Sequence, residues 1–312
     1  MKRRNRIINQ TDFKKEIESI PLSYVEATDK YLGYHLLKNN RLETIKTNKQ
    51  MFDTFGKFLE SEFPNLLSDI NLIEPEHIEL YVKWSMERGN KSTTINKKVN
   101  GLKYFFRYLL GRKMVSKNPV EVVPLKTVDK KPKVIMTREL LEKAVKETDK
   151  NSFVGIRSIT IAYVLFNTGL RIGELKRLKV TDVDFKKREL KIEESKNRKY
   201  RIVPINKECE KYLKVWLKIR GDIKDHDYIF INELNQTISI RTIQQCVKDM
   251  FANIGHNEIH CHSFRKGFIS SLVEKGVPLT TIAAIVGHSN LNQLMTYTGT
   301  KEEEKHKAMR SI

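Results

Sequence analysis

The chain has 312 residues, which is enough for about two domains that each bury a sizeable core. Its 58 Lys and Arg against 38 Asp and Glu give a formal charge of +20, typical of nucleic-acid binders but shared by ribosomal and membrane-surface proteins. Three cysteines without regular spacing exclude a disulfide framework and indicate a reducing compartment. The basic N-terminus lacks a signal peptide's apolar stretch and the longest apolar run is too short to span a membrane, so we expect a cytoplasmic protein.

The first part of the chain is predicted to be helical. Residues 1–20 are a basic lead-in, and 21–116 carry helical patterns, with helices expected at 42–62, at 75–88 and from a cap at Ser92 onward. The last helix has apolar residues at intervals of three and four, the period of one buried stripe: Ile95, Val99, Leu102, Phe105, Phe106 and Leu109. The pattern predicts a small helical bundle.

Basic side chains lie off this apolar stripe. They include Lys97, Lys98, Lys103 and Arg107. They form either an ordinary solvated face or a surface that follows DNA phosphates, and the helix alone does not decide between the two. After it, residues 117–133 contain three prolines and a cluster of charges, so we expect a linker there.

The second domain is expected over 134–312. Thr137 resembles the cap of a helix over 138–148. A helix over 156–167 can end at Gly169 in the left-handed conformation, and a short helix over 171–178 follows it. Two strands, 189–194 and 200–204, are predicted to form a β-hairpin. Further helices are predicted at 207–220, 240–254, 262–275, 279–286 and 291–296, with glycines after the third and fourth, Gly276 and Gly287. The fold class is therefore mainly α with a small β-sheet.

Six residues of this domain suit one reaction, the attack of a tyrosine hydroxyl on a phosphodiester. They are Arg171, Lys196, His262, Arg265, His288 and Tyr297. Tyr297 lies in a polar segment and is the candidate nucleophile, although forming its phenolate at neutral pH costs about 4 kcal/mol without help from neighbours. Arg171 and Arg265 are the candidate phosphate clamp, because a guanidinium binds two non-bridging oxygens and keeps its proton. A basic residue in a helix's first turn, as expected for Arg171, opposes the helix dipole and so suggests an anionic ligand.

The remaining members have proton-transfer and binding roles. His262 would accept the tyrosine proton or hold the phosphate, and His288 would donate a hydrogen bond to a phosphate oxygen. Lys196, in the hairpin turn, would protonate the departing 5′ oxygen, and Arg198 and Lys199 are rivals for that role. We expect no cofactor.

A metal site is the alternative to this interpretation. The donors His256, His260, Cys261 and His262 are close in sequence, but neighbouring residues on one short segment cannot all face one zinc ion. The sequence also lacks a Gly-rich nucleotide-phosphate loop and an obvious carboxylate trio for two metal ions. We therefore predict chemistry without a metal ion.

Taken together, these motifs resemble the tyrosine recombinase, or phage integrase, family. The resemblance rests on the arginine box 168–175, Ser195-Lys196-Asn197 before 201–204, the His-x-x-Arg box at 262–265, and Gly287-His288-Ser289 through Tyr297. The segment 92–109 is similar to the last helix of the family's core-binding domain. Lys266 departs from the family's frequent histidine, and Phe264 from a frequent leucine, without removing a proposed catalytic group.

The resemblance implies a site-specific recombinase or integrase. It implies a core-binding domain at 21–116 and a catalytic domain at 134–312 that clamp duplex DNA, a homo-tetramer, a 3′-phosphotyrosyl bond and a Holliday junction. It also implies a location at the nucleoid. It does not decide whether the protein serves a mobile element or whether an accessory DNA-bending protein takes part. Two alternatives remain: a catalytically silent DNA-binding accessory protein, and a type IB topoisomerase that relaxes supercoils without sequence preference.

Overall fold

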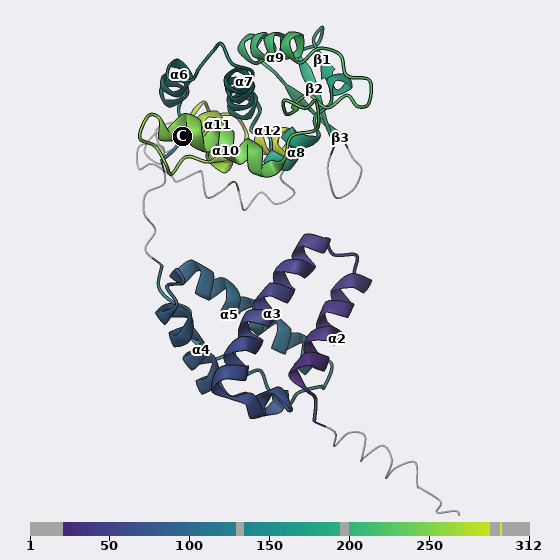
Figure 1. Cartoon of the computed structure of the whole chain (residues 1–312), viewed down its shortest axis with the longest axis vertical. Helices are drawn as coiled ribbons and strands as arrows, with labels where there is room; N and C mark the ends of the chain where they lie inside the picture. The colour runs from purple at the N-terminus through teal and green to yellow at the C-terminus, as the bar shows by residue number, and fades with distance from the viewer. Residues whose placement is uncertain (1–20, 129–133, 194–199, 288–293, 295–312) are drawn as a thin grey trace, which may run out of the picture. The chain divides into compact units, whose positions relative to one another are not determined.

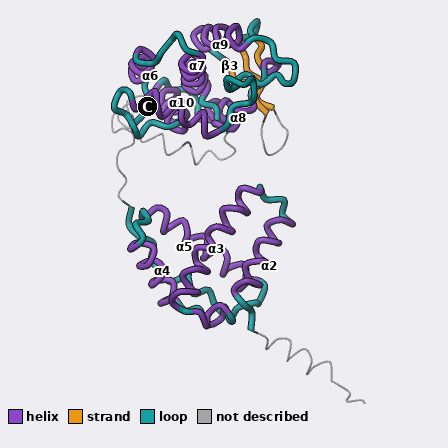
Figure 2. The backbone as a smooth tube through the Cα atoms, in the orientation of Figure 1, coloured by secondary structure: helices purple, strands orange, loops and turns teal. Residues whose placement is uncertain are grey.

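The computed structural model describes residues 21–128, 134–193, 200–287 and 294. It divides into two compact units, Met1–Lys131 and Pro132–Ile312 (Figure 1). The described residues are largely helical and carry one three-stranded sheet (Figure 2), which confirms the predicted fold class. Within the described part of the chain, no helix is both long enough and apolar enough to cross a membrane.

The first unit is a bundle of four α-helices in the part that the structure describes. They are α2 (Tyr24–Leu37), α3 (Leu42–Glu62), α4 (Pro75–Glu87) and α5 (Ser92–Gly111), with short 3-10 turns η1 (Pro64–Leu67) and η2 (Ile70–Leu72) between α3 and α4. Aromatic rings fill the core, where Tyr81 packs against Phe55 and Phe58. The six predicted apolar positions of α5 are all buried, as expected. Ser92 is the first helical residue rather than the cap, which is Lys91.

The predicted linker is wrong in its first part. Val120 and Val123 are buried in the core of the first unit. The side-chain amide of Asn96 exchanges two 2.8 Å hydrogen bonds with the backbone of Lys126, which ties this segment to α5. Prolines stop a helix here, but they do not prevent the valines between them from packing. Residues 129–133 lie outside the described residues.

The second unit begins with α6 (Arg138–Lys146), α7 (Phe153–Thr168) and α8 (Ile172–Arg177), followed by the turn η3 (Val180–Asp182). The antiparallel sheet has the order β1 (Val183–Asp184), β2 (Glu189–Glu193), β3 (Tyr200–Pro204). The chain continues through α9 (Lys207–Arg220), α10 (Ile240–Ala252), α11 (Cys261–Glu274) and α12 (Leu279–Val286). Helix α7 is buried on most of its surface and packs against α9, α10 and α11. The helix predicted at 291–296 lies outside the described residues except for the buried Leu294.

Several local predictions for this unit are confirmed. The Thr137 hydroxyl accepts a hydrogen bond from the backbone of Leu140 and caps α6. Gly169 ends α7 with φ +60°, and a Cβ there would lie 2.5 Å from the ring of Phe268, so the end of α7 packs tightly on α11. The β2–β3 hairpin forms with Leu190 opposite Val203, and both residues face the core.

Candidate active site

Arg171 is fixed at the turn between α7 and α8. It is the N-cap of α8 rather than a residue of the first helical turn. Its backbone N–H donates to Glu174 Oε2 at 2.8 Å, and its Nη1 donates to Glu174 Oε1 at 3.1 Å. Within the chain, Glu174 therefore balances the charge of Arg171, and the anionic ligand that the sequence suggested stays a prediction. The side chain of Arg171 remains 44% exposed.

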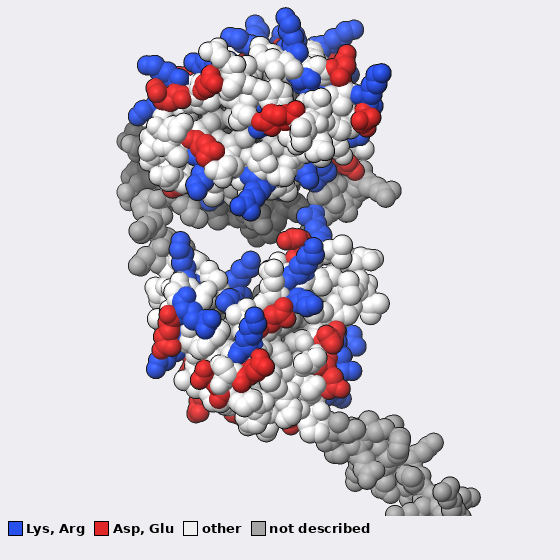
Figure 3. Space-filling view, viewed as in Figure 1, with Lys and Arg blue, Asp and Glu red and all other residues white. Residues whose placement is uncertain are grey.

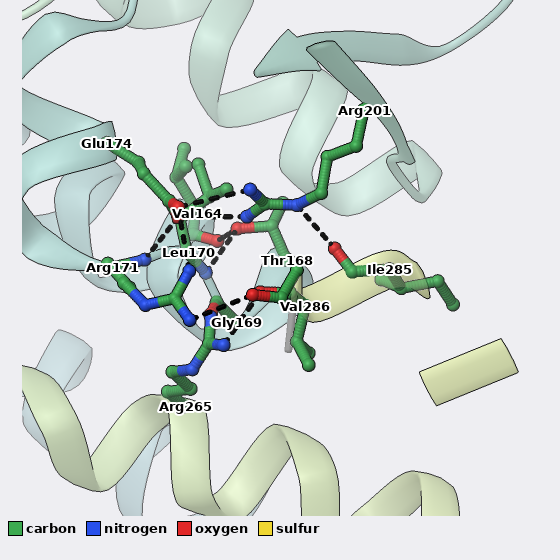
Figure 4. Close-up of polar contacts among 11 residues, drawn as sticks. Val164, Thr168, Gly169, Leu170, Arg171, Glu174, Arg201, Arg265, Ile285 and Val286 are labelled. Carbon is green, nitrogen blue, oxygen red and sulfur yellow. Dashed lines mark hydrogen bonds and ion pairs between the residues drawn. The ribbon is translucent and has the colours of Figure 1, made fainter. Parts of the chain in front are cut away.

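Arg265 reaches the same place from α11. Its side chain is buried, and Nη1 donates to the carbonyl of Gly169 at 2.8 Å. Nη2 donates to the carbonyl of Val286 at 2.7 Å, while Arg171 Nη2 donates to the next carbonyl, that of Gly287, at 2.9 Å (Figure 4). The two candidate clamp residues are thus brought together at the end of α12.

His262 lies one helical turn before Arg265 on α11 and is exposed. Although the residue is exposed, part of its ring is shielded from water, and this desolvation lowers the pKa of His262 below its ordinary value of 6.5; the positive charges of Lys266 and Arg265 lower it further. His260 and Arg171 make smaller contributions in the same direction. At neutral pH the imidazole is therefore uncharged and able to accept a proton.

Three predicted site residues, Lys196, His288 and Tyr297, lie outside the described residues. The structure does fix the elements next to two of them. The hairpin that carries Lys196 is paired as far as Glu193 and Tyr200, and Gly287, which precedes His288, ends α12 with φ +66°.

Two further residues of the site belong to the sequence motifs but had no predicted role. Glu174 and Arg201 form a buried ion pair, in which Arg201 Nη1 donates to Glu174 Oε1 at 3.1 Å and Nη2 to Oε2 at 2.9 Å. Burial alone would raise the pKa of Glu174, but hydrogen bonds from Arg201 and from the Arg171 backbone outweigh it and hold the pKa below its usual range. The sequence signal that could have revealed this pair is Arg201 itself, a charged residue at an inward-facing position of β3.

The candidate zinc donors have other partners. His260 Nδ1 lies 2.5 Å from Ser263 Oγ, and His256 Nδ1 lies 2.9 Å from Glu258 Oε1. Among the residues that the structure describes, no group of three or more His, Cys, Asp or Glu side chains is placed to hold a metal ion.

The predicted DNA-binding residues of α5 fall into two pairs. Lys103 and Arg107 both approach Glu121 Oε1, at 3.1 and 3.5 Å. Lys97 and Lys98 line a groove that also includes residues of α3. On the face drawn in Figure 3, Lys and Arg crowd the upper part of the first unit, whereas Asp and Glu are more frequent over its lower part.

Comparisons with known proteins identify the family of this chain. Residues 116–304 match the model of the phage integrase family. The chain is 28% identical over 278 residues to the tyrosine recombinase XerC of Pediococcus pentosaceus, covering 86% of this chain and 91% of that protein. It is 25% identical over 274 residues to XerC of Bacillus subtilis, covering 85% and 88%.

Solved structures share the fold. The Tn1549 transposon integrase in complex with a circular intermediate DNA superimposes with a TM-score of 0.79 at 20% identity, covering 93% of this chain and all of that one. The lambda integrase dimer bound to a COC′ core site gives 0.70 at 15% identity, covering 93% and 82%. Because the family model matches more than half of it, the chain belongs to the phage integrase family of tyrosine recombinases, a family of enzymes.

Proposed function

We propose that the protein is a site-specific DNA recombinase that cleaves and rejoins duplex DNA through a 3′-phosphotyrosyl intermediate, without metal or ATP. The observation that carries this proposal is the convergence of Arg171 and Arg265 on the carbonyls of Gly287 and Val286, the two residues that precede His288 in the sequence. The proposal is also supported by the sequence, because all six residues that the reaction calls for are present: Arg171, Lys196, His262, Arg265, His288 and Tyr297.

In the proposed reaction, the Tyr297 hydroxyl oxygen attacks phosphorus while the bond to the 5′ oxygen breaks. His262 accepts the phenolic proton, or holds the phosphate, and Lys196 gives a proton to the departing 5′ oxygen. The arginines stabilise the extra charge on the non-bridging oxygens in the transition state. Because the phosphotyrosyl bond conserves the energy of the broken linkage, a 5′-hydroxyl can reverse the step without ATP.

We assign duplex DNA as the partner, held by both units. The first unit would act as the core-binding domain, with Lys97, Lys98, Lys103 and Arg107 near phosphates. Solved relatives of this fold include an integrase in complex with circular intermediate DNA and an integrase dimer bound to a core site, which supports this assignment. A homo-tetramer working through a Holliday junction is part of the same proposal.

A trapping experiment tests the function. Nicked random-sequence duplexes, whose short cleaved fragment diffuses away, are incubated with the protein, and covalent adducts are isolated under denaturing conditions. We expect a Tyr297-dependent adduct that disappears in Tyr297→Phe and a recovered sequence that defines the target site.

The alternatives give other results. A catalytically silent accessory protein would bind DNA but yield no adduct with any sequence. A topoisomerase would form adducts without sequence preference and relax plasmids that lack the recovered site. Either result would replace the proposed function.

A further inference from the structure

Arg201 joins three elements of the second unit. It lies on β3, is 8% exposed, and binds both carboxylate oxygens of Glu174 on α8. Its Nε donates at 2.8 Å to the carbonyl of Ile285 at the end of α12 (Figure 4). A planar guanidinium that is held at three donors has little freedom to rotate. Hydrogen bonds from this one side chain therefore connect β3 to α8 and to the end of α12.

The first link from Arg201 to Arg171 is the shared carboxylate. Glu174 is 7% exposed and accepts four hydrogen bonds, two from Arg201 and two from Arg171. A buried carboxylate needs compensating charge, and here two guanidinium groups divide that task. Of these four hydrogen bonds, only the two from Arg171 would remain without Arg201, and Glu174 would draw the Arg171 guanidinium toward itself.

The second link is the turn at Gly287. A Cβ at Gly287 would lie 2.8 Å from Arg201 Nη1, so the glycine backbone packs directly on the Arg201 guanidinium. The carbonyl of the same glycine accepts the 2.9 Å hydrogen bond from Arg171 Nη2. Arg201 thus packs against Gly287, whose carbonyl accepts a hydrogen bond from Arg171 Nη2. It also binds the Glu174 carboxylate, which accepts a hydrogen bond from Arg171 Nη1.

We propose that Arg201 is a positioning residue for Arg171 in DNA cleavage. It takes half of the hydrogen bonds to Glu174 and supports the Gly287 turn, so that the exposed part of the Arg171 guanidinium keeps the orientation that the scissile phosphate requires. This inference rests on the proposed function. It predicts that loss of Arg201 weakens the phosphate clamp itself, beyond any effect on folding.

The test compares single-turnover cleavage of two nicked duplexes of the sequence recovered by trapping. One carries the ordinary scissile phosphodiester, and the other carries a methylphosphonate, whose neutral phosphorus centre needs less cationic stabilisation. We expect Arg201→Met to slow cleavage of the phosphodiester by about tenfold to a hundredfold, the range expected for a catalytic group displaced by about 1 Å. On the methylphosphonate its rate should stay within about threefold of wild type, because the clamp matters less there.

Two further variants keep the test decisive. Arg201→Lys retains a positive charge without the bidentate geometry, so it should fold if Arg201→Met does not, and show the same substrate-dependent loss in weaker form. Arg157→Met is the matched control, because Arg157 is also buried and binds a backbone carbonyl, that of Ile231, but lies near the start of α7. It should lower Tm while leaving the ratio of the two rates unchanged.

The outcomes separate cleanly. If the wild-type protein forms no Tyr297-dependent adduct, the proposed function fails. If the wild type cleaves and the folded Arg201 variants cleave the phosphodiester as fast, or slow equally on both substrates, Arg201 does not act through the clamp and the inference alone is overturned.

Discussion

Arg171 and Arg265 donate hydrogen bonds to two consecutive carbonyl groups, those of Gly287 and Val286, at 2.9 and 2.7 Å. The two arginines come from different helix ends, and Arg265 also binds the carbonyl of Gly169, two residues before Arg171. The end of α7 and the end of α12 therefore meet at this pair of guanidinium groups (Figure 4). The orientations of both guanidinium groups are set by backbone acceptors before any substrate binds, which is the preorganisation that the proposed phosphate clamp needs.

We predict that Arg171→Ala and Arg265→Ala each abolish DNA cleavage while leaving DNA binding largely intact. Removing one donor that stabilises charge in a transition state typically costs about 10²–10³ in rate. Covalent adduct formation measures the first effect, and band-shift titration of an uncleaved duplex measures the second. Full cleavage activity in either variant would refute the clamp assignment.

The same two variants should differ in stability. Arg265 is buried and bonded to two carbonyls, so Arg265→Ala should lower the free energy of unfolding by about 2–4 kcal/mol. Arg171 is 44% exposed, so its loss should cost about 1 kcal/mol or less. Thermal unfolding of both variants beside wild type checks this order, and a lower Tm for Arg171→Ala than for Arg265→Ala would contradict it.

Cleavage should depend on pH through His262. The neutral imidazole is the form that accepts a proton, and partial burial, then Lys266 and Arg265, lower its pKa. A lowered pKa keeps the neutral form present at lower pH, so the rate should stay high at pH 7 and fall only below 6.5. Single-turnover rates from pH 5 to 8 measure this limb.

Lys266 provides a control for that assignment. Lys266→Gln removes a positive charge that lowers the pKa of His262, so the acid limb should move to higher pH while the plateau rate is unchanged. His262→Gln should remove the limb and reduce the plateau. An acid limb that is the same in all three proteins would assign it to a different group.

Local sequence signals predicted much of the fold. The cap at Thr137, the helix end at Gly169 and the β-hairpin of β2 and β3 each depend on residues close in sequence, and the structure confirms them. The linker was partly misplaced, because burial of Val120 and Val123 depends on packing against distant helices that proline counting cannot show.

The site was predictable as a set of residues but not as a geometry. Spacing indicated Arg171 and Arg265, and only the structure shows that they reach one turn. The Glu174–Arg201 ion pair was missed because the inward position of Arg201 on β3 does not say which residue is its partner, and Glu174 lies on α8, 27 positions earlier in the chain.

Gly287→Ala should damage both folding and cleavage. The position has φ +66°, and the added methyl would lie 2.8 Å from Arg201 Nη1, so the turn must move away from the arginines. We expect a loss of about 1–3 kcal/mol in stability and at least a tenfold slower cleavage. Gly276→Ala is the matched control, because φ there is +73° but nothing lies within 4 Å of the added Cβ. Equal cleavage defects in the two variants would show that backbone strain alone, and not contact with Arg201, is responsible.

Salt dependence can test the DNA-binding role of α5. Removing a cation that neutralises one DNA phosphate should reduce the slope of log affinity against log salt by about 0.9, so Lys97→Gln and Lys98→Gln should each flatten it by about that amount. Glu121 lies beside Lys103 and Arg107, and Glu121→Gln should strengthen binding because it removes the negative charge that these cations now face.

Lys214→Gln is the matched control for the α5 variants, since Lys214 is exposed on α9 and pairs with Glu210 at 2.7 Å, and its slope should equal that of wild type. Titration of a nonspecific duplex at several salt concentrations gives all of these slopes. If Lys97→Gln and Lys98→Gln behave like Lys214→Gln, their charges belong to an ordinary solvated face and contact no phosphate.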